Sequence, residues 1–278
     1  MHALTKIGAA AAITCVTTYG SATAHAAPPQ TETPLSSIEA CANGTRSSTP
    51  VLLVHGTNAT VQQSLGSVRD GLLEDGRCVY GLDYDSRQAL STSAEYFAAA
   101  VERIIEINHT DSIELVGKSQ GGLIARAVSL EFADRPVNPI KKVVAISGPQ
   151  HGVSKTVGGV EVTALAGQVP GLRDKMPALV DMLAGSDYLN ELNRGPMTAP
   201  GVRYTMIASR DDAIATPYTT AFIDAPNVTN IVIQDGCPDD HAGHLAETTD
   251  PRTIDLTLHA LDPQRHPIIR CTANNDRR

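Results

Sequence analysis

The sequence predicts an α/β protein in which helices cover both faces of a mostly parallel, doubly wound sheet. Short runs that are apolar at nearly every position alternate with segments of helical periodicity, and one run ends at a Gly-x-Ser-x-Gly pattern before a helix. Continuous apolar runs are typical of strands buried on both faces of a parallel sheet. Strands that alternate with helices imply right-handed crossovers. A chain of 278 residues in this class is expected to fold as one domain.

Residues 1–26 have the features of a secretory signal peptide. Lys6 precedes an apolar run over residues 7–16, and Ala24-His25-Ala26 is a small-residue cleavage site. The run is too short to span a bilayer. Cys15 lacks a good lipobox, so a lipid anchor is the less favoured alternative. We therefore expect a secreted, extracellular chain of residues 27–278.

The acidic charge disfavours two kinds of partner. The formal net charge is −8, and loss of Lys6 with the leader changes it to −9. Nucleic acid and anionic membrane surfaces are therefore not expected to bind.

The cysteines of the mature chain predict two disulfides. Cys41, Cys78, Cys237 and Cys271 remain after the leader, and an even count is typical of exported proteins. Three pairings are arithmetically open. We favour Cys41 with Cys78 and Cys237 with Cys271, because each pair brackets adjacent elements. No Cys-x-x-Cys spacing supports a zinc site.

The elements can be placed in chain order from apolar runs and helical periodicity. Residues 27–49 are rich in Pro, Thr, Ser and Asn, which predicts an extended lead-in. Strands are expected at residues 50–54, 78–84, 112–117, 142–147, 202–208 and 228–233, and helices at residues 61–75, 94–108, 123–132, 176–183 and 186–192.

The segment of about residues 152–201 is long for a plain crossover between two strands. Several glycines and Pro170 interrupt it. It is interpreted as a helical cap insertion that shapes the substrate cleft, and a rigid, decorated crossover is the alternative.

Ser119 is the candidate nucleophile. It lies in Gly117-Lys118-Ser119-Gln120-Gly121, between an apolar run and a helical segment. A sharp strand-to-helix turn needs small neighbours two residues before and after its centre. Such a turn would expose the hydroxyl and place the amide of Gln120 at a helix N-terminus, where it favours an oxyanion.

A serine nucleophile needs a base, and the base needs an acid to orient it. The acid candidates are Asp212 and its rival Asp211, which follow the strand ending at Ala208. For the base, His241 and His244 follow the last strand, which gives the chain order Ser, Asp, His.

Asp240, His241 and His244 could instead be metal ligands. No third strong ligand cluster accompanies them, so no metal and no other cofactor are expected.

Four segments together resemble the extracellular triacylglycerol lipases of actinobacteria, over about residues 41–271. That resemblance implies an α/β-hydrolase fold, with Ser119 as nucleophile, Asp212 as acid and His244 as base. It implies an oxyanion hole made by the amides of Thr57 and Gln120, and its paired cysteines agree with the pairing favoured above. The segments are Val51 to Thr57, Gly117 to Gly122, Ser209 to Tyr218, and Cys237 through His244 to Pro251.

Two residues depart from the pattern of those lipases. Lys118 stands where they usually carry His, and this chain has no Trp. Both differences could change the preferred acyl chain.

The favoured function is therefore a secreted carboxylic ester hydrolase, of the triacylglycerol lipase kind. A short-chain esterase, a polyester depolymerase and a secreted acyltransferase with the same triad are the alternatives. A non-catalytic protein that kept the fold is the alternative from another class. The expected partners are a lipid or other ester substrate and a transient lipid interface, and the chain is expected to be a monomer.

Overall fold

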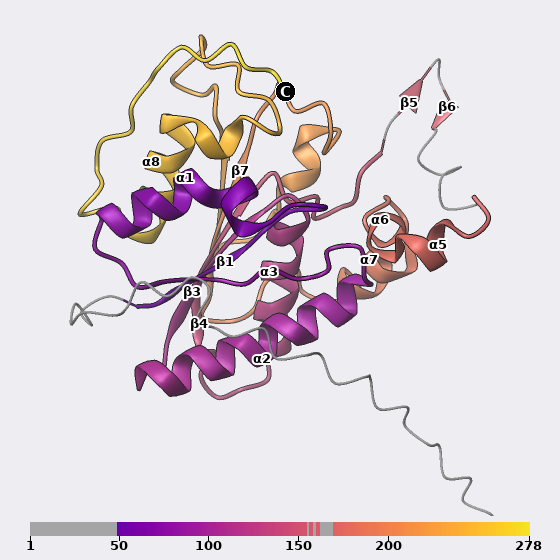
Figure 1. Ribbon diagram of the computed structural model, residues 1–278, viewed down its shortest axis with the longest axis horizontal. Coiled ribbons are helices and arrows are strands. Elements are labelled where there is room, and N and C mark those ends of the chain that lie inside the picture. Colours follow the sequence, from indigo (N-terminus) through magenta and orange to yellow (C-terminus); the bar gives the residue numbers. More distant parts are fainter. Residues whose placement is uncertain (1–48, 155, 158–159, 162–168) are drawn as a thin grey trace, which may run out of the picture. The chain divides into compact units, whose positions relative to one another are not determined.

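An all-parallel sheet lies at the centre of the structure (Figure 1). It has six strands, in the order β2-β1-β3-β4-β7-β8. The computed structural model describes residues 49–154, 156–157, 160–161 and 169–278. They all belong to one of the two units into which the chain divides, Pro34–Arg278. The sheet strands are β1 (Val51–Val54), β2 (Val79–Gly81), β3 (Ile113–Lys118), β4 (Ile140–Ile146), β7 (Arg203–Ala208) and β8 (Val228–Val232).

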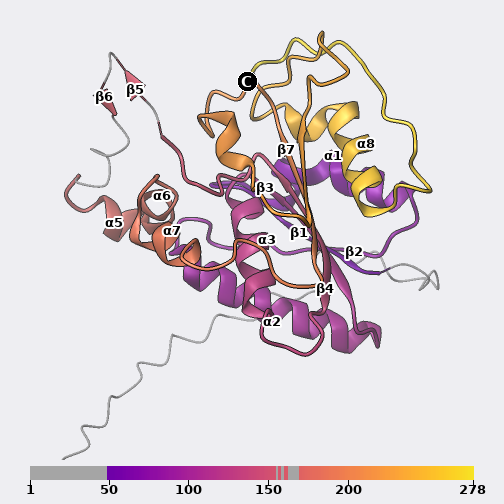
Figure 2. The ribbon, with the colours of Figure 1, turned by 180° about the vertical axis from the view of Figure 1, so that it is seen from behind.

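Helices cover both faces of this sheet. The main helices are α1 (Val61–Glu74), α2 (Leu90–Asn108), α3 (Gln120–Glu131) and α8 (Pro251–Leu261). Leu52 and Val54 of β1 join the apolar core under α2 and α3. Val51 and Leu53 join the core under α1 and α8, and Figures 1 and 2 show these two helix pairs on opposite sides of the sheet. Each apolar run is continuous because alternate side chains enter two different cores, so the predicted doubly wound sheet is confirmed.

Two predicted boundaries are wrong for the same reason, a long-range hydrogen bond. A strand was predicted over 78–84, but β2 ends at Gly81, and the Tyr84 amide beyond it donates to His55 Nε2 at 3.3 Å. A helix was predicted over 94–108, but α2 begins at Leu90. The Leu90 amide donates to the buried Asp181 carboxylate at 3.1 Å, and this acceptor satisfies one of the amides at the helix start.

The segment of residues 152–201 is only partly described. It contains a short antiparallel pair, β5 (Thr156–Val157) with β6 (Val160–Glu161), and helices α5 (Leu172–Lys175), α6 (Pro177–Asp181) and α7 (Asp187–Leu192). The helix predicted over 176–183 is present as the shorter α6, which begins at Pro177 because the missing amide of proline suits the first helical position. Helix α5 is not among the predicted elements.

Helix α8 is absent from the predictions, although its start signal is plain. The Asp250 side chain accepts a hydrogen bond from the Thr253 amide at 2.8 Å, and Pro251 stands at the first helical position. The short 3-10 helices η2 (Tyr218–Ala221) and η3 (Glu247–Thr249) complete the element order.

The leader, the lead-in and Cys41 lie outside the described residues, so the predictions that fall on them stay predictions. Within the described ranges, no helix is both long and apolar enough to cross a bilayer. The sequence placed the candidate site after the ends of β1, β3, β7 and β8, and in a parallel sheet these carboxyl ends meet along one edge.

Candidate active site

Ser119 lies in a sharp turn between β3 and α3, as predicted. Its backbone has φ 54° and ψ −123°, a strained conformation for a residue other than glycine. A Cβ on Gly117 would lie 2.2 Å from the Gly121 carbonyl oxygen, and one on Gly121 would lie 1.9 Å from the Val54 carbonyl oxygen. Both contacts are prohibitive, so the two glycines are what allow the turn to close against β1.

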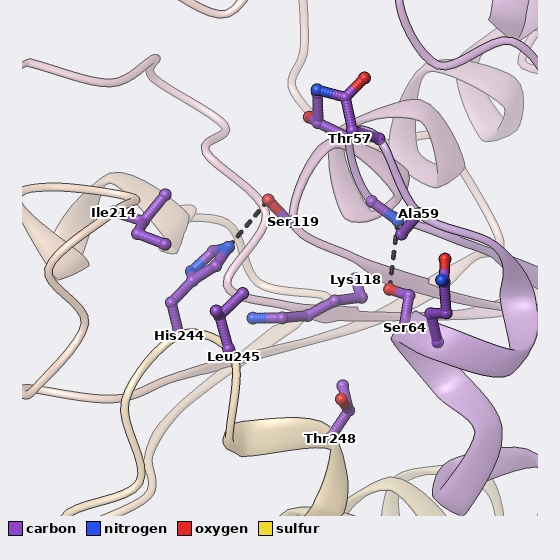
Figure 3. A pocket seen from close by; sticks show the side chains of 12 residues that line it. Thr57, Ala59, Ser64, Lys118, Ser119, Ile214, His244, Leu245 and Thr248 are labelled. Carbon is purple, nitrogen blue, oxygen red and sulfur yellow. Dashed lines mark hydrogen bonds between the residues drawn. The ribbon is translucent and has the colours of Figure 1, made fainter. Parts of the chain in front are cut away.

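The structure brings the three predicted catalytic side chains into one chain of hydrogen bonds. His244 Nε2 lies 3.0 Å from the Ser119 hydroxyl oxygen (Figure 3), and His244 Nδ1 lies 2.6 Å from Asp212 Oδ2. Asp212 and His244 are buried. This is the geometry in which an imidazole can accept the serine proton while a carboxylate fixes its tautomer.

The environment of Asp212 favours its ionised form. Burial alone would raise the pKa of this carboxyl. The hydrogen bond from His244 and the electrostatic effects of His244 and Lys118 outweigh burial and hold the pKa of Asp212 below its ordinary value. Its second oxygen accepts the amides of Ile214 and Ala215, both at 2.8 Å. Asp212 is therefore a carboxylate held from both sides.

The rival acid and base form a second pair beside the first. His241 Nδ1 lies 2.7 Å from Asp211 Oδ2, and Arg277 contacts the other Asp211 oxygen at 3.3 Å. Both residues of this pair are partly exposed. The geometry thus separates the alternatives that the sequence left open, since Asp212 and His244 are the pair joined to Ser119.

The loops of the predicted oxyanion hole are linked directly. The Thr57 hydroxyl donates to Gln120 Oε1 at 2.6 Å, and Gln120 Nε2 donates to the Ser86 carbonyl at 2.9 Å. Within the described residues, neither the Thr57 amide nor the Gln120 amide donates a hydrogen bond to the protein. Two such amides near the nucleophile suit a developing negative oxygen.

His55 supports the first of these loops. It is fully buried, and burial lowers the pKa of its imidazole. Its Nδ1 lies 2.8 Å from the Gly56 carbonyl, while its Nε2 accepts the Tyr84 amide at 3.3 Å. Both contacts fit a neutral ring with the proton on Nδ1, so His55 fixes the backbone ahead of Thr57.

A cavity of about 470 Å³ opens beside Ser119 (Figure 3). Ile214 and Leu245 lie on its His244 side and are 51% and 63% exposed. No described residue of the 152–201 segment lines it, so the predicted cap role stays a prediction. The lining consists of Gly56, Thr57, Asn58, Ala59, Gln63, Ser64, Lys118, Ser119, Ile214, His244, Leu245 and Thr248.

In the described part of the chain, one cluster has the spacing of metal ligands. Ligand atoms of Asp212, His244 and Glu247 all lie within 4.8 Å of one another. Asp212 and His244 bind each other, and Glu247 forms an ion pair with Lys118, so these donors already have partners. The predicted rival set of Asp240, His241 and His244 is not brought together in this way.

Glu247 is the residue that the sequence analysis missed. It is fully buried, three residues after His244, and contacts Lys118 directly. Two signals could have found it: a lysine beside the nucleophile, which needs a partner if buried, and an acid one helical turn beyond the candidate base.

The loop that carries His244 is held by the Cys237–Cys271 disulfide, which is present in the structure. Beyond Cys271 the tail runs alongside this loop. Backbone hydrogen bonds join His241 to Asn274 at 2.7 Å, Gly243 to Asp276 at 2.9 Å and Leu245 to Arg278 at 2.6 Å. The disulfide and the tail therefore restrain the same backbone that positions His244.

Replacing both cysteines of this disulfide by serine is expected to lower kcat roughly 3- to 100-fold, since a displacement of about 1 Å can reduce a rate by two orders of magnitude. The measurement is hydrolysis of a nitrophenyl ester, with the folded fraction checked by circular dichroism. The control is the double serine variant of Cys41 and Cys78, the other predicted pair, whose kcat should change less. Unchanged turnover of the Cys237→Ser/Cys271→Ser variant would contradict the role of the disulfide.

Comparison with known families gives one match. A family model described as palmitoyl protein thioesterase matches residues 50–193, just over half of the 278 residues. The matched range includes the Ser119 turn and ends before Asp212 and His244. No curated protein matches the chain.

Solved structures with a similar fold include two lipases and another alpha/beta hydrolase enzyme. Lipase B of Aspergillus fumigatus is 21% identical with a TM-score of 0.65, over 80% of this chain and 56% of that chain. Lipase BlEst2 of Bacillus licheniformis, in its mature form, is 15% identical with a TM-score of 0.57, over 77% and 91%. MGS-MChE2, an alpha/beta hydrolase enzyme from a lagoon-sediment metagenome, is 18% identical with a TM-score of 0.52, over 78% and 91%.

At these identities the likeness shows the fold alone. The chain has the α/β-hydrolase fold, as predicted, and spans little more than half the length of the fungal lipase. The resemblance to actinobacterial lipases stays a prediction.

Proposed function

The chain belongs to the palmitoyl protein thioesterase family, and we propose that it is a serine hydrolase of long-chain carboxylic esters, of the triacylglycerol lipase type. The observation that carries the proposal is the hydrogen-bond chain from Ser119 through His244 to Asp212. The resemblance of the motifs to extracellular lipases supports the choice of ester over other acyl substrates.

In the proposed reaction the Ser119 oxygen attacks the ester carbonyl as its proton passes to His244 Nε2. Asp212 stabilises the imidazolium, and the amides of Thr57 and Gln120 hold the oxyanion. The carbonyl re-forms as the alcohol leaves with the proton from His244, and Ser119 stays acylated. Water then gives a proton to His244 and attacks the acyl group, which releases the acid and returns the proton to Ser119.

The apolar residues at the mouth of the cavity support a long acyl chain as substrate. Ile214 and Leu245 are large, exposed and close to His244. A methylene group that leaves water contributes up to about 0.8 kcal/mol of binding. A chain that crosses both residues would therefore bind better than a short one.

Export is also proposed. The leader of residues 1–26 and the Cys237–Cys271 disulfide support it, because disulfides persist in oxidising compartments. Sequencing the N-terminus of the protein recovered from culture medium tests cleavage near Ala26.

The family match favours a second candidate substrate, a palmitoyl thioester. The same triad can attack either acyl group, because both reactions pass through a tetrahedral oxyanion. The two candidates differ in the leaving atom, oxygen or sulfur, and kinetics separate them.

For nitrophenyl esters from butyrate to palmitate, presented in mixed micelles, kcat/KM is expected to rise at least about tenfold with chain length. Replacing Ile214 or Leu245 by serine should flatten the rise. Val137→Ser, at another exposed apolar residue, is the matched control and should keep it. A preference for butyrate would contradict the long-chain proposal, and faster turnover of a palmitoyl thioester than of the palmitate ester would favour the second candidate.

A further inference from the structure

The residue before the nucleophile is a buried lysine with a specific partner. Lys118 ends β3 and is only 4% exposed, although part of it lines the cavity. Its Nζ donates to Glu247 Oε2. The charge of Lys118, which lines the cavity, is therefore balanced by Glu247.

Glu247 ties the His244 loop to three neighbouring strands. Its Oε2 accepts Lys118 at the end of β3, and its Oε1 accepts the Ser147 hydroxyl at 2.6 Å and the Ser209 amide at 3.1 Å. Ser147 directly follows β4, and Ser209 directly follows β7. One carboxylate thus joins the ends of β3, β4 and β7 to the turn that begins three residues after His244.

These same strand ends carry the other members of the triad. Ser119 directly follows Lys118. Asp212 lies in a turn that begins at Ser209, and its amide donates to the Ser209 carbonyl at 3.2 Å. The contacts of Glu247 therefore reach the side chain of the residue before Ser119 and the backbone three residues before Asp212, and Glu247 itself lies three residues after His244. A shift of this carboxylate would move the three catalytic groups relative to one another.

Charge is the second part of the argument. An oxygen of Glu247 lies within 4.8 Å of the ligand atoms of both Asp212 and His244. Two buried carboxylates so close disfavour each other's ionisation unless a cation is present. Lys118 supplies that cation, and the pair adds no net charge beside the imidazole.

We propose that Lys118 and Glu247 are a positioning pair, which holds the His244 loop against the Ser119 turn and balances the charge beside the imidazole. The inference rests on the proposed hydrolase function of the same site. It makes a prediction that a purely structural ion pair does not. Removal of Lys118 leaves a negative charge next to His244, whereas removal of Glu247 leaves a positive charge there.

The experiment measures kcat/KM as a function of pH. The acid limb of this profile, where kcat/KM falls as the pH is lowered, reports the pKa of the free enzyme's base. Lys118→Met leaves Glu247 as an uncompensated anion, stabilises the imidazolium and should move the limb to higher pH. Glu247→Gln leaves Lys118 as an uncompensated cation and should move it to lower pH. Each shift is expected to be on the order of 1 pH unit, with a fall of about 10- to 100-fold in the plateau.

Two further variants complete the cycle. The double variant Lys118→Met/Glu247→Gln restores neutrality, so its limb should return close to that of the wild type while its plateau stays low. Lys118→Arg keeps the charge and should keep the limb. The limb is a property of the active molecules, so partial misfolding of a variant lowers the plateau without moving the limb.

A buried ion pair at the other end of β3 serves as the matched control. Glu114 is 3% exposed and contacts Arg77 at 2.8 Å and Lys142 at 2.7 Å. Glu114→Gln should lower the thermal midpoint and leave the limb in place. If the acid limbs of Lys118→Met and Glu247→Gln stay in place, or move in the same direction, the proposal of a positioning pair is overturned. If the wild-type enzyme hydrolyses neither esters nor thioesters, the proposed function itself is overturned.

Discussion

Replacing Ser119 by alanine is expected to lower kcat/KM for a nitrophenyl ester by roughly 10⁴- to 10⁶-fold, the loss typical of a serine nucleophile. The hydroxyl contacts His244 at 3.0 Å, and without it no oxygen is placed to attack the carbonyl. Alanine is smaller than serine and keeps the same backbone demand, so the fold should survive. Rates and circular dichroism of both proteins provide the measurement.

A fluorophosphonate probe gives the same test without a substrate. The probe should label wild-type protein covalently and should not label Ser119→Ala. The matched control is Ser129→Ala, because Ser129 is another buried serine, in the last turn of α3, where it is hydrogen-bonded to Arg126 and Tyr204. That variant should lose some stability and keep the labelling. Persistent labelling of Ser119→Ala would remove Ser119 from the role of nucleophile.

The parts of the fold that depend on local pattern could be predicted from the sequence. The strand at residues 50–54 is an example, because burial in two cores leaves no position for a polar side chain. The turn at Ser119 is another, since Gly117 and Gly121 meet backbone atoms that no side chain could approach.

The parts that depend on distant partners could not be predicted in this way. Lys118 and Glu247 are 129 residues apart, and although a buried lysine needs a partner, the sequence does not say which acid the fold brings to it. The early start of α2 depends on Asp181, which lies 91 residues from Leu90. Sequence periodicity carries no information about such contacts, whereas the fold that brings strand ends to one edge explains both.

The choice between two neighbouring acids lies between these cases. Asp211 and Asp212 share one turn after β7, and position alone could not separate them. The structure does so because each carboxylate has its own histidine, His241 for Asp211 and His244 for Asp212. The Asp211 pair is therefore a natural control for the Asp212 pair.

Asp212→Asn is expected to lower kcat roughly 10⁴-fold, because an amide in place of the carboxylate favours the wrong tautomer of His244. Asp211→Asn should change kcat less than about threefold, since it alters a partly exposed pair with little energetic effect. Both variants are compared at a pH above the acid limb, where the wild-type base is neutral. Equal losses in the two variants would contradict the assignment of the acid.

The pH dependence of stability gives an independent test of the same carboxylate. The pKa of Asp212 is lowered in the folded protein, so this group contributes stability above its unfolded pKa of about 3.9 and loses that contribution as pH falls through its folded value. Asp212→Asn removes a carboxyl group that takes up a proton more readily in the unfolded state than in the folded state. The free energy of unfolding of this variant should therefore fall less steeply below about pH 4. Urea unfolding of wild type, Asp212→Asn and Asp211→Asn at matched pH measures the slopes, and a slope for Asp212→Asn as steep as that of the wild type would show that Asp212 is not held as a carboxylate.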